Sequence, residues 1–215
     1  MCKWIKWDGT GRSRPFLDEN FDNIYYMLQY ISHGRYDSCE TNQKIQNLKK
    51  KPNRPSNELY YKNEAIHEFA HDLASILTDV KKPCYITWIP PSKANTDEEY
   101  DDRIEQVVRL ACEQSREMIP VEIFKRNSSA QSLHTGGQRN PHTISSNWDF
   151  IAPTPNNPDI KDVIVVDDVI TTGATMRAAF DLISSALPDV TKIGIAWAIV
   201  IDNPDVKSIF NVDTE

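Results

Sequence analysis

Two adjacent carboxylates, Asp167 and Asp168, stand within VIVVDDVITTGAT, the segment that spans residues 163–175. The β-branched residues before them predict a strand that is buried on both faces, with the two carboxylates at its carboxyl end. Carboxylates accept hydrogen bonds from sugar hydroxyls and hold Mg²⁺ directly or through water. The pair therefore favours a site for a sugar, a metal ion or both.

The loop after the carboxylates has the composition of a phosphate cradle. It offers hydroxyl groups from Thr171, Thr172 and Thr175, and it opens a predicted helix whose N-terminus directs backbone N–H groups at an anion. Gly173 allows a positive φ and a close approach of the backbone to a ligand. A phosphorylated sugar with a metal-bound leaving group suits both the loop and the carboxylates.

Strands and helices alternate along most of the chain and predict the frame that positions this segment. The expected elements are a helix over 60–79, a strand over 84–89, a helix that opens with a capping box at Thr96 and Glu99, a strand over 121–124, a long polar loop over 125–160, a strand over 162–168, a helix over 174–186 and a strand over 192–201. This order predicts an α/β fold that is doubly wound, with a mainly parallel sheet and helices on both faces. Ligands of such sheets bind beyond the carboxyl ends of the strands.

The first part of the chain has a different pattern. Residues 1–59 are rich in aromatic and polar side chains, and we expect them to form an N-terminal appendage to a core at 60–215. A helix is predicted near 20–33. The basic stretch QNLKKKPNRP, residues 46–55, is interpreted as an exposed loop in preference to a binding patch.

Composition narrows the function classes. The 215 residues carry a net charge of −7, which argues against a general nucleic-acid or membrane-surface protein because both partners repel anions. The apolar run over 193–201 is far shorter than a membrane span, and the first residues lack the apolar core of a signal peptide, so a cytoplasmic protein is expected. No CxxC pair occurs, which favours reduced thiols over a disulfide framework or zinc site. The cysteines are Cys2, Cys39, Cys84 and Cys112.

The segment 163–175 resembles the signature with which type I phosphoribosyltransferases bind 5-phosphoribosyl-1-pyrophosphate (PRPP), and it is most similar to the orotate and ComF-type branches. In that family the acidic pair holds the ribose hydroxyls, and the loop holds the 5-phosphate. The resemblance implies PRPP as co-substrate and Mg²⁺ as cofactor, with the metal held by the two aspartates. It assigns PRPP binding to Asp167, Asp168, Val169, Thr171, Thr172, Gly173, Ala174 and Thr175.

Two further segments resemble family features. The family binds pyrophosphate on the loop after the first strand of the sheet, a place that Pro90 to Lys93 occupy here, and Pro91, Ser92 and Lys93 are the predicted contacts; a proline-terminated turn is the alternative. Residues 125–140 resemble the flexible loop of ComF-type proteins, although the N-terminal cysteine zinc cluster of that branch is missing. The matching positions are Lys125, Arg126, Gln131, Leu133, Arg139 and Asn140. An ordinary solvated loop is the alternative here.

The resemblance implies a transferase in which an acceptor displaces pyrophosphate from C1 of PRPP. Asp167 and Asp168 would hold the ribose and metal, while Lys93, Arg126 and Arg139 would neutralise pyrophosphate. The appendage would hold an acceptor that the sequence does not identify, and assembly as a homodimer stays open. The alternative is a sensor that binds PRPP or a nucleotide without turnover.

A second motif points to different chemistry. His67 to His71 spell HExxH, the zinc-metalloprotease pattern, on a predicted helix. At helical spacing, however, both histidines lie away from the apolar arc around Phe69 and Leu73, and the sequence suggests no third ligand. We therefore interpret this motif as a solvent-facing helix surface.

Overall fold

The structure is a computed structural model that describes residues 3–10, 12–19, 22–80, 83–113, 115, 117–127, 140–154, 157 and 159–202. Its strands are β1 (Ile5–Lys6), β2 (Asn23–Ile31), β3 (Cys84–Trp88), β4 (Met118–Pro120), β5 (Phe124–Arg126), β6 (Trp148–Phe150), β7 (Asp162–Ile170) and β8 (Thr191–Ile201). Its helices are α1 (Glu40–Leu48), α2 (Ser56–Leu77), α3 (Arg103–Cys112), α4 (Pro141–Ser145) and α5 (Ala174–Ala186).

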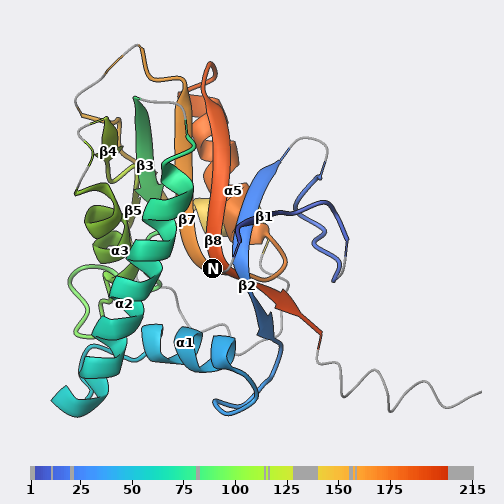
Figure 1. Ribbon diagram of the computed structural model, residues 1–215. Coiled ribbons are helices and arrows are strands. Elements are labelled where there is room, and N and C mark those ends of the chain that lie inside the picture. Colours follow the sequence, from blue (N-terminus) through green and yellow to red (C-terminus); the bar gives the residue numbers. More distant parts are fainter. Residues whose placement is uncertain are drawn as a thin grey trace, which may run out of the picture.

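A six-stranded sheet forms the centre, with the strand order β1-β2-β8-β7-β3-β4 (Figure 1). Strands β2, β8, β7, β3 and β4 pair in parallel, and only the short β1 is antiparallel to its neighbour among these described pairs. The predicted α/β fold with a mainly parallel sheet is confirmed. The carboxyl ends of the parallel β7 and β8 lie at the same edge of the sheet, and α1 lies below this edge in Figure 1.

Helices cover both faces of this sheet. On one face α1, α2 and α3 pack in a core where the rings of Phe69 and Trp197 stack with centroids 4.9 Å apart. On the other face α5 and the small β5–β6 sheet pack in a core that includes Phe180 and Phe124. Because β7 is buried on both faces, its apolar residues 163–166 are fully enclosed, as the β-branched run predicted.

The predicted helix near 20–33 is wrong, because this segment forms β2. Ile24 and Tyr26 pack on the α5 face, while Tyr25 between them packs on the face of α2, which is the alternation of a strand between two layers. Its residues pair with β8 along the whole length of β2. Residues before 59 thus contribute two strands to the central sheet.

The third predicted helix begins later than its capping box indicated. The segment around Thr96 forms turns, in which the Asp97 N–H donates to the Ala94 carbonyl and the Tyr100 N–H donates to the Asp97 carbonyl. Helix α3 begins only at Arg103. The capping-box pattern is therefore misleading here, because successive turns satisfy the backbone before the helix starts.

The segments after α3 also differ from the prediction. The parallel partner of β3 is β4 at 118–120, just before the predicted strand at 121–124, although the Val121 N–H continues the pairing with a 2.9 Å bond to the Ile86 carbonyl. The expected loop over 125–160 contains α4 and the antiparallel β5–β6 pair. Contact between Phe124 and Trp148, at 5.5 Å between ring centroids, stabilises this pair in the core.

Along the described ranges no helix has both the length and the apolar character that crossing a bilayer requires. Cys84 and Cys112 are buried free thiols, and Cys39 is a half-buried one.

Candidate active site

Asp167 and Asp168 lie close to the carboxyl end of β7, where the strand leaves the core. Asp168 lies on the face of Ile164 and Val166, where Lys49 after α1 and Arg103 of α3 contact it. Asp168 is buried, with 6% exposed, whereas Asp167 is half-buried. The adjacent carboxylates thus have different surroundings.

Two cations hold Asp168. Its Oδ2 lies 2.7 Å from Nη2 and 3.3 Å from Nε of Arg103, the first residue of α3. Its Oδ1 lies 3.1 Å from Nζ of Lys49, the residue directly after α1. Burial acts to raise the pKa of Asp168, but Lys49 and Arg103 outweigh burial and the pKa is lowered. Asp168 is therefore ionised, and the two cations balance its negative charge.

The ion pairs continue from Arg103 to α2. Nη1 of Arg103 lies 2.7 Å from Oδ2 of Asp101, and Nζ of Lys62 lies 2.7 Å from the same oxygen. Burial lowers the pKa of Lys62, and Asp101 partly offsets that effect. Lys62 also donates to the backbone carbonyl of Lys50. This buried cluster fastens α2, α3 and the segment after α1 to the end of β7.

Asp167 has a different environment. Its Oδ1 accepts a 2.8 Å hydrogen bond from the backbone N–H of Asp168, and within the described ranges no lysine or arginine forms an ion pair with it. Burial first, and the charge of Asp168 second, raise the pKa of Asp167. An external hydroxyl or cation would relieve the cost of its negative charge.

The loop between β7 and α5 has the backbone that its glycine predicted. Gly173 has a φ of 83° and stands at the N-cap of α5, where it offers no side chain to the first helical N–H groups. Thr171 is exposed and Thr175 half-buried, and the Thr172 hydroxyl accepts from the Ala174 N–H at 3.4 Å. The hydroxyls and the end of the helix thus share one short loop.

A segment of the first 59 residues lies against this loop. A Cβ on Gly173 would lie 2.3 Å from Cγ of Leu17, and Nε of Arg177 donates a 3.0 Å bond to the carbonyl of Phe16. A second pair of Arg177 with Asp22 fixes the same segment. Any side chain larger than hydrogen at 173 would therefore displace Leu17 and also strain the backbone.

Of the predicted pyrophosphate contacts, Pro91, Lys93 and Arg126 line a cleft of about 170 Å³ beyond β3 and β4, together with Lys125 and the carboxylates of Glu105 and Glu122. Arg126 donates from Nε to the Pro91 carbonyl, which joins the two predicted segments. Lys93 pairs with Asp97 at 3.4 Å, and Ser92 is exposed beside it. Arg139, like Gln131 and Leu133, lies outside the described residues.

Residues 104–208 match the family described as phosphoribosyl transferase domain, a range that includes β7, the loop and α5. Residues 104–208 therefore form a phosphoribosyl transferase domain. The mostly parallel sheet between helices agrees with the type I phosphoribosyltransferase fold that the resemblance implied. Among curated proteins, none matches the sequence significantly.

Solved structures of phosphoribosyltransferases are also similar. The Helicobacter pylori xanthine-guanine-hypoxanthine phosphoribosyltransferase is 12% identical over 69% of this chain and 96% of its own, with a TM-score of 0.39. A Staphylococcus aureus hypoxanthine phosphoribosyltransferase is 16% identical over 65% of this chain and 64% of its own, with a TM-score of 0.37.

The sequence interpretation missed two residues at this candidate site. Lys49 belongs to the basic stretch 46–55, which was expected to be a solvated loop, and Arg103 was expected inside a helix without a role. The charge run of residues 49–51 was a signal for Lys49, but a charge run alone does not separate a site from a solvated surface.

The HExxH face of α2 is exposed, as predicted. His67 and His71 are exposed on α2, and Glu68 pairs with Lys44 of α1. In the part of the chain that the structure describes, no group of three His, Cys, Asp or Glu residues could hold a metal ion.

Proposed function

We propose that this phosphoribosyltransferase transfers the ribose 5-phosphate of PRPP to an unidentified acceptor and releases pyrophosphate. One observation carries the proposal. Within the family domain, the half-buried Asp167 and the positive-φ loop before α5 stand in a single strand–loop–helix segment. A sugar phosphate needs such a pairing of carboxylate and anion cradle.

The loop would bind the 5-phosphate. The N-cap Gly173 has no side chain to cap α5, although the Ala174 N–H makes a long bond to the Thr172 hydroxyl, and a helix N-terminus attracts an anion through its N–H groups and its dipole. The hydroxyls of Thr171, Thr172 and Thr175 would complete the cradle, with Ala174 and Val169 at its two ends.

The carboxylates would hold the ribose and magnesium. Mg²⁺ prefers oxygen ligands and is commonly bound by one or two carboxylates plus substrate phosphates, so the site fits this ion. Bound Mg²⁺ would neutralise the pyrophosphate. Because two cations already engage Asp168, Asp167 has the more available oxygens, while both residues remain in the proposed site.

Pyrophosphate would leave toward the cleft beyond β3. Lys93 and Arg126 supply positive charge there, with Pro91 and Ser92 beside them, and Arg139 is proposed to join from the segment after β5. As the C1–oxygen bond breaks, positive charge develops on the ribose and negative charge on pyrophosphate. Fixed cations and exclusion of water stabilise that charge separation.

Residues 1–59 are proposed to cover the acceptor. Their helix α1 lies below the edge where β7 and β8 end in Figure 1. We place the reaction in the cytoplasm.

A sensor that binds PRPP or a nucleotide without turnover is the second candidate, favoured by the engagement of Asp168 with Lys49 and Arg103. The test is pyrophosphate release from PRPP and Mg²⁺ over a panel of purines, pyrimidines and other ring-nitrogen acceptors. Release that requires one acceptor, and that Asp167→Asn abolishes, supports the transferase. Binding of PRPP without release across the panel supports the sensor.

A further inference from the structure

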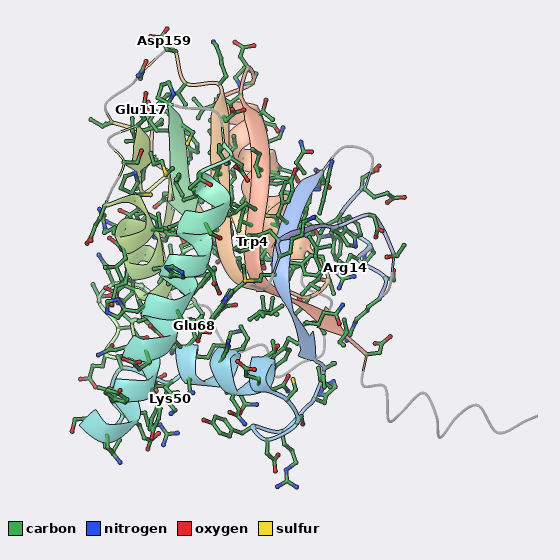
Figure 2. The ribbon with its side chains drawn as sticks, viewed as in Figure 1. Trp4, Arg14, Lys50, Glu68, Glu117 and Asp159 are labelled. Atoms are coloured by element: carbon green, nitrogen blue, oxygen red, sulfur yellow. The ribbon has the colours of Figure 1, made fainter. Side chains whose placement is uncertain are left out.

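The basic stretch 46–55 was expected to be a loop, but its residues 46–48 form the end of α1, and residues 49–55 connect α1 to α2. Figure 2 labels Lys50, which lies where these helices meet. Lys49 precedes it, and its side chain is 43% exposed although its ammonium contacts the buried Asp168. The Lys49 side chain thus extends from the solvent-exposed surface to the buried Asp168 near the carboxyl end of β7.

The same stretch also reaches the predicted pyrophosphate segment. Lys51 pairs with Oε1 of Glu99, and Oε2 of Glu99 lies 3.9 Å from Nζ of Lys93. Lys49 and Lys51 therefore run from Asp168 toward the segment of Pro91 and Lys93.

Charge balance allows Lys49 to change partners. Arg103 contacts Oδ2 of Asp168 through both Nη2 and Nε, so the carboxylate keeps a cationic partner when Lys49 leaves Oδ1. Pyrophosphate carries several negative charges, and it attracts an ammonium more strongly than one compensated carboxylate does. The flexible stem of a lysine permits that movement.

We propose that Lys49 is a pyrophosphate-binding residue, held by Asp168 until PRPP enters. The inference rests on the proposed function. When the bond between C1 and the pyrophosphate oxygen breaks, its electron pair stays on that oxygen while the acceptor bonds to C1. Lys49 contributes positive charge to the departing group and transfers no proton.

The experiment measures the binding of magnesium pyrophosphate and, separately, of ribose 5-phosphate by calorimetry. Lys49→Met is expected to weaken pyrophosphate binding roughly 10- to 100-fold, the loss expected for a hydrogen bond to a charged group, and to change ribose 5-phosphate binding less than about twofold. Lys49→Arg should retain most of the pyrophosphate affinity. Lys50→Met is the matched control, because Lys50 lies over the ring of Tyr61 at 4.9 Å, and it should bind both ligands like the wild type.

The outcomes separate two failures. Wild-type protein that binds neither ligand and does not turn over PRPP overturns the proposed function and this inference together. Wild-type protein that binds both, with Lys49→Met unchanged or equally weakened for both ligands, overturns the role of Lys49 alone. A change confined to the acceptor KM also overturns it. Thermal melts of each variant identify any loss that comes from unfolding.

Discussion

Nη2 of Arg103 lies 2.7 Å from Oδ2 of Asp168. This contact joins the first residue of α3 to the end of β7, and the other arm of the guanidinium joins Asp101 at 2.7 Å. Burial acts to lower the pKa of Arg103, but Asp168 first and Asp101 next outweigh burial and raise it. The ion pair therefore positions the strand end against the helices that surround the site.

Replacing Arg103 by methionine should destabilise the fold. Removal of one partner of a buried ion pair leaves uncompensated charge and costs 3–5 kcal/mol in typical cases; we expect about 3 kcal/mol, because Lys49 and Lys62 still contact the two carboxylates. Urea denaturation measures the change. Arg54→Met, which breaks an exposed pair with Glu58, should cost less than about 0.5 kcal/mol. Equal losses of unfolding free energy in both variants would show that the buried pair stabilises the fold no more than the exposed pair does.

Asp72 should give a pH-dependent contribution to stability. Its Oδ2 accepts a 2.9 Å bond from Nε1 of Trp197, and burial raises its pKa in spite of that bond. A raised carboxyl pKa means that ionisation costs more in the folded than in the unfolded state, so stability falls as pH rises through the folded pKa. Asp72→Asn keeps an acceptor and avoids the charge. Its Tm relative to wild type should therefore be higher near about pH 7 than near about pH 4.

Asp72→Ala provides the control for this measurement. It leaves the buried indole N–H of Trp197 without this acceptor and should cost about 1–3 kcal/mol at both pH values. If Asn and Ala variants melt alike, the hydrogen bond to Trp197 does not contribute as described.

The HExxH motif should have no part in activity. His67→Ala and His71→Ala remove exposed side chains and should each change stability by less than about 0.5 kcal/mol. Elemental analysis of the purified protein should find no stoichiometric zinc, and activity should require added Mg²⁺. Zinc at one per chain that disappears in His71→Ala together with activity would place the chemistry on α2.

Local patterns predicted the central segment well. The β-branched run of β7 and the loop with Gly173 carry their structural information in adjacent residues, and the predicted helix 174–186 agrees with α5. Strand β2 was misjudged because Ile24, Met27 and Ile31 also fit helical spacing. Only its pairing with β8 distinguishes the two, and that partner is remote in sequence.

The ion pairs of the site could not be predicted for a related reason. Lys49, Arg103 and Asp168 come from three distant segments, and no spacing rule connects them. Their contact follows from the packing of α1 and α3 against the end of β7. A signature within one segment identifies the chemistry of the site, whereas the groups that surround it depend on tertiary structure.

The most direct test of the central claim is calorimetric titration of PRPP with Mg²⁺ into wild-type protein and two variants of the 171–175 loop. Wild type should bind one PRPP per chain. Thr172→Val should weaken binding by about 1 kcal/mol or more, and Gly173→Val should abolish it, because the valine would meet Leu17 and strain a φ of 83°. Circular dichroism confirms that each variant is folded. Unchanged PRPP affinity in both folded variants would contradict the assignment of this loop to the phosphate.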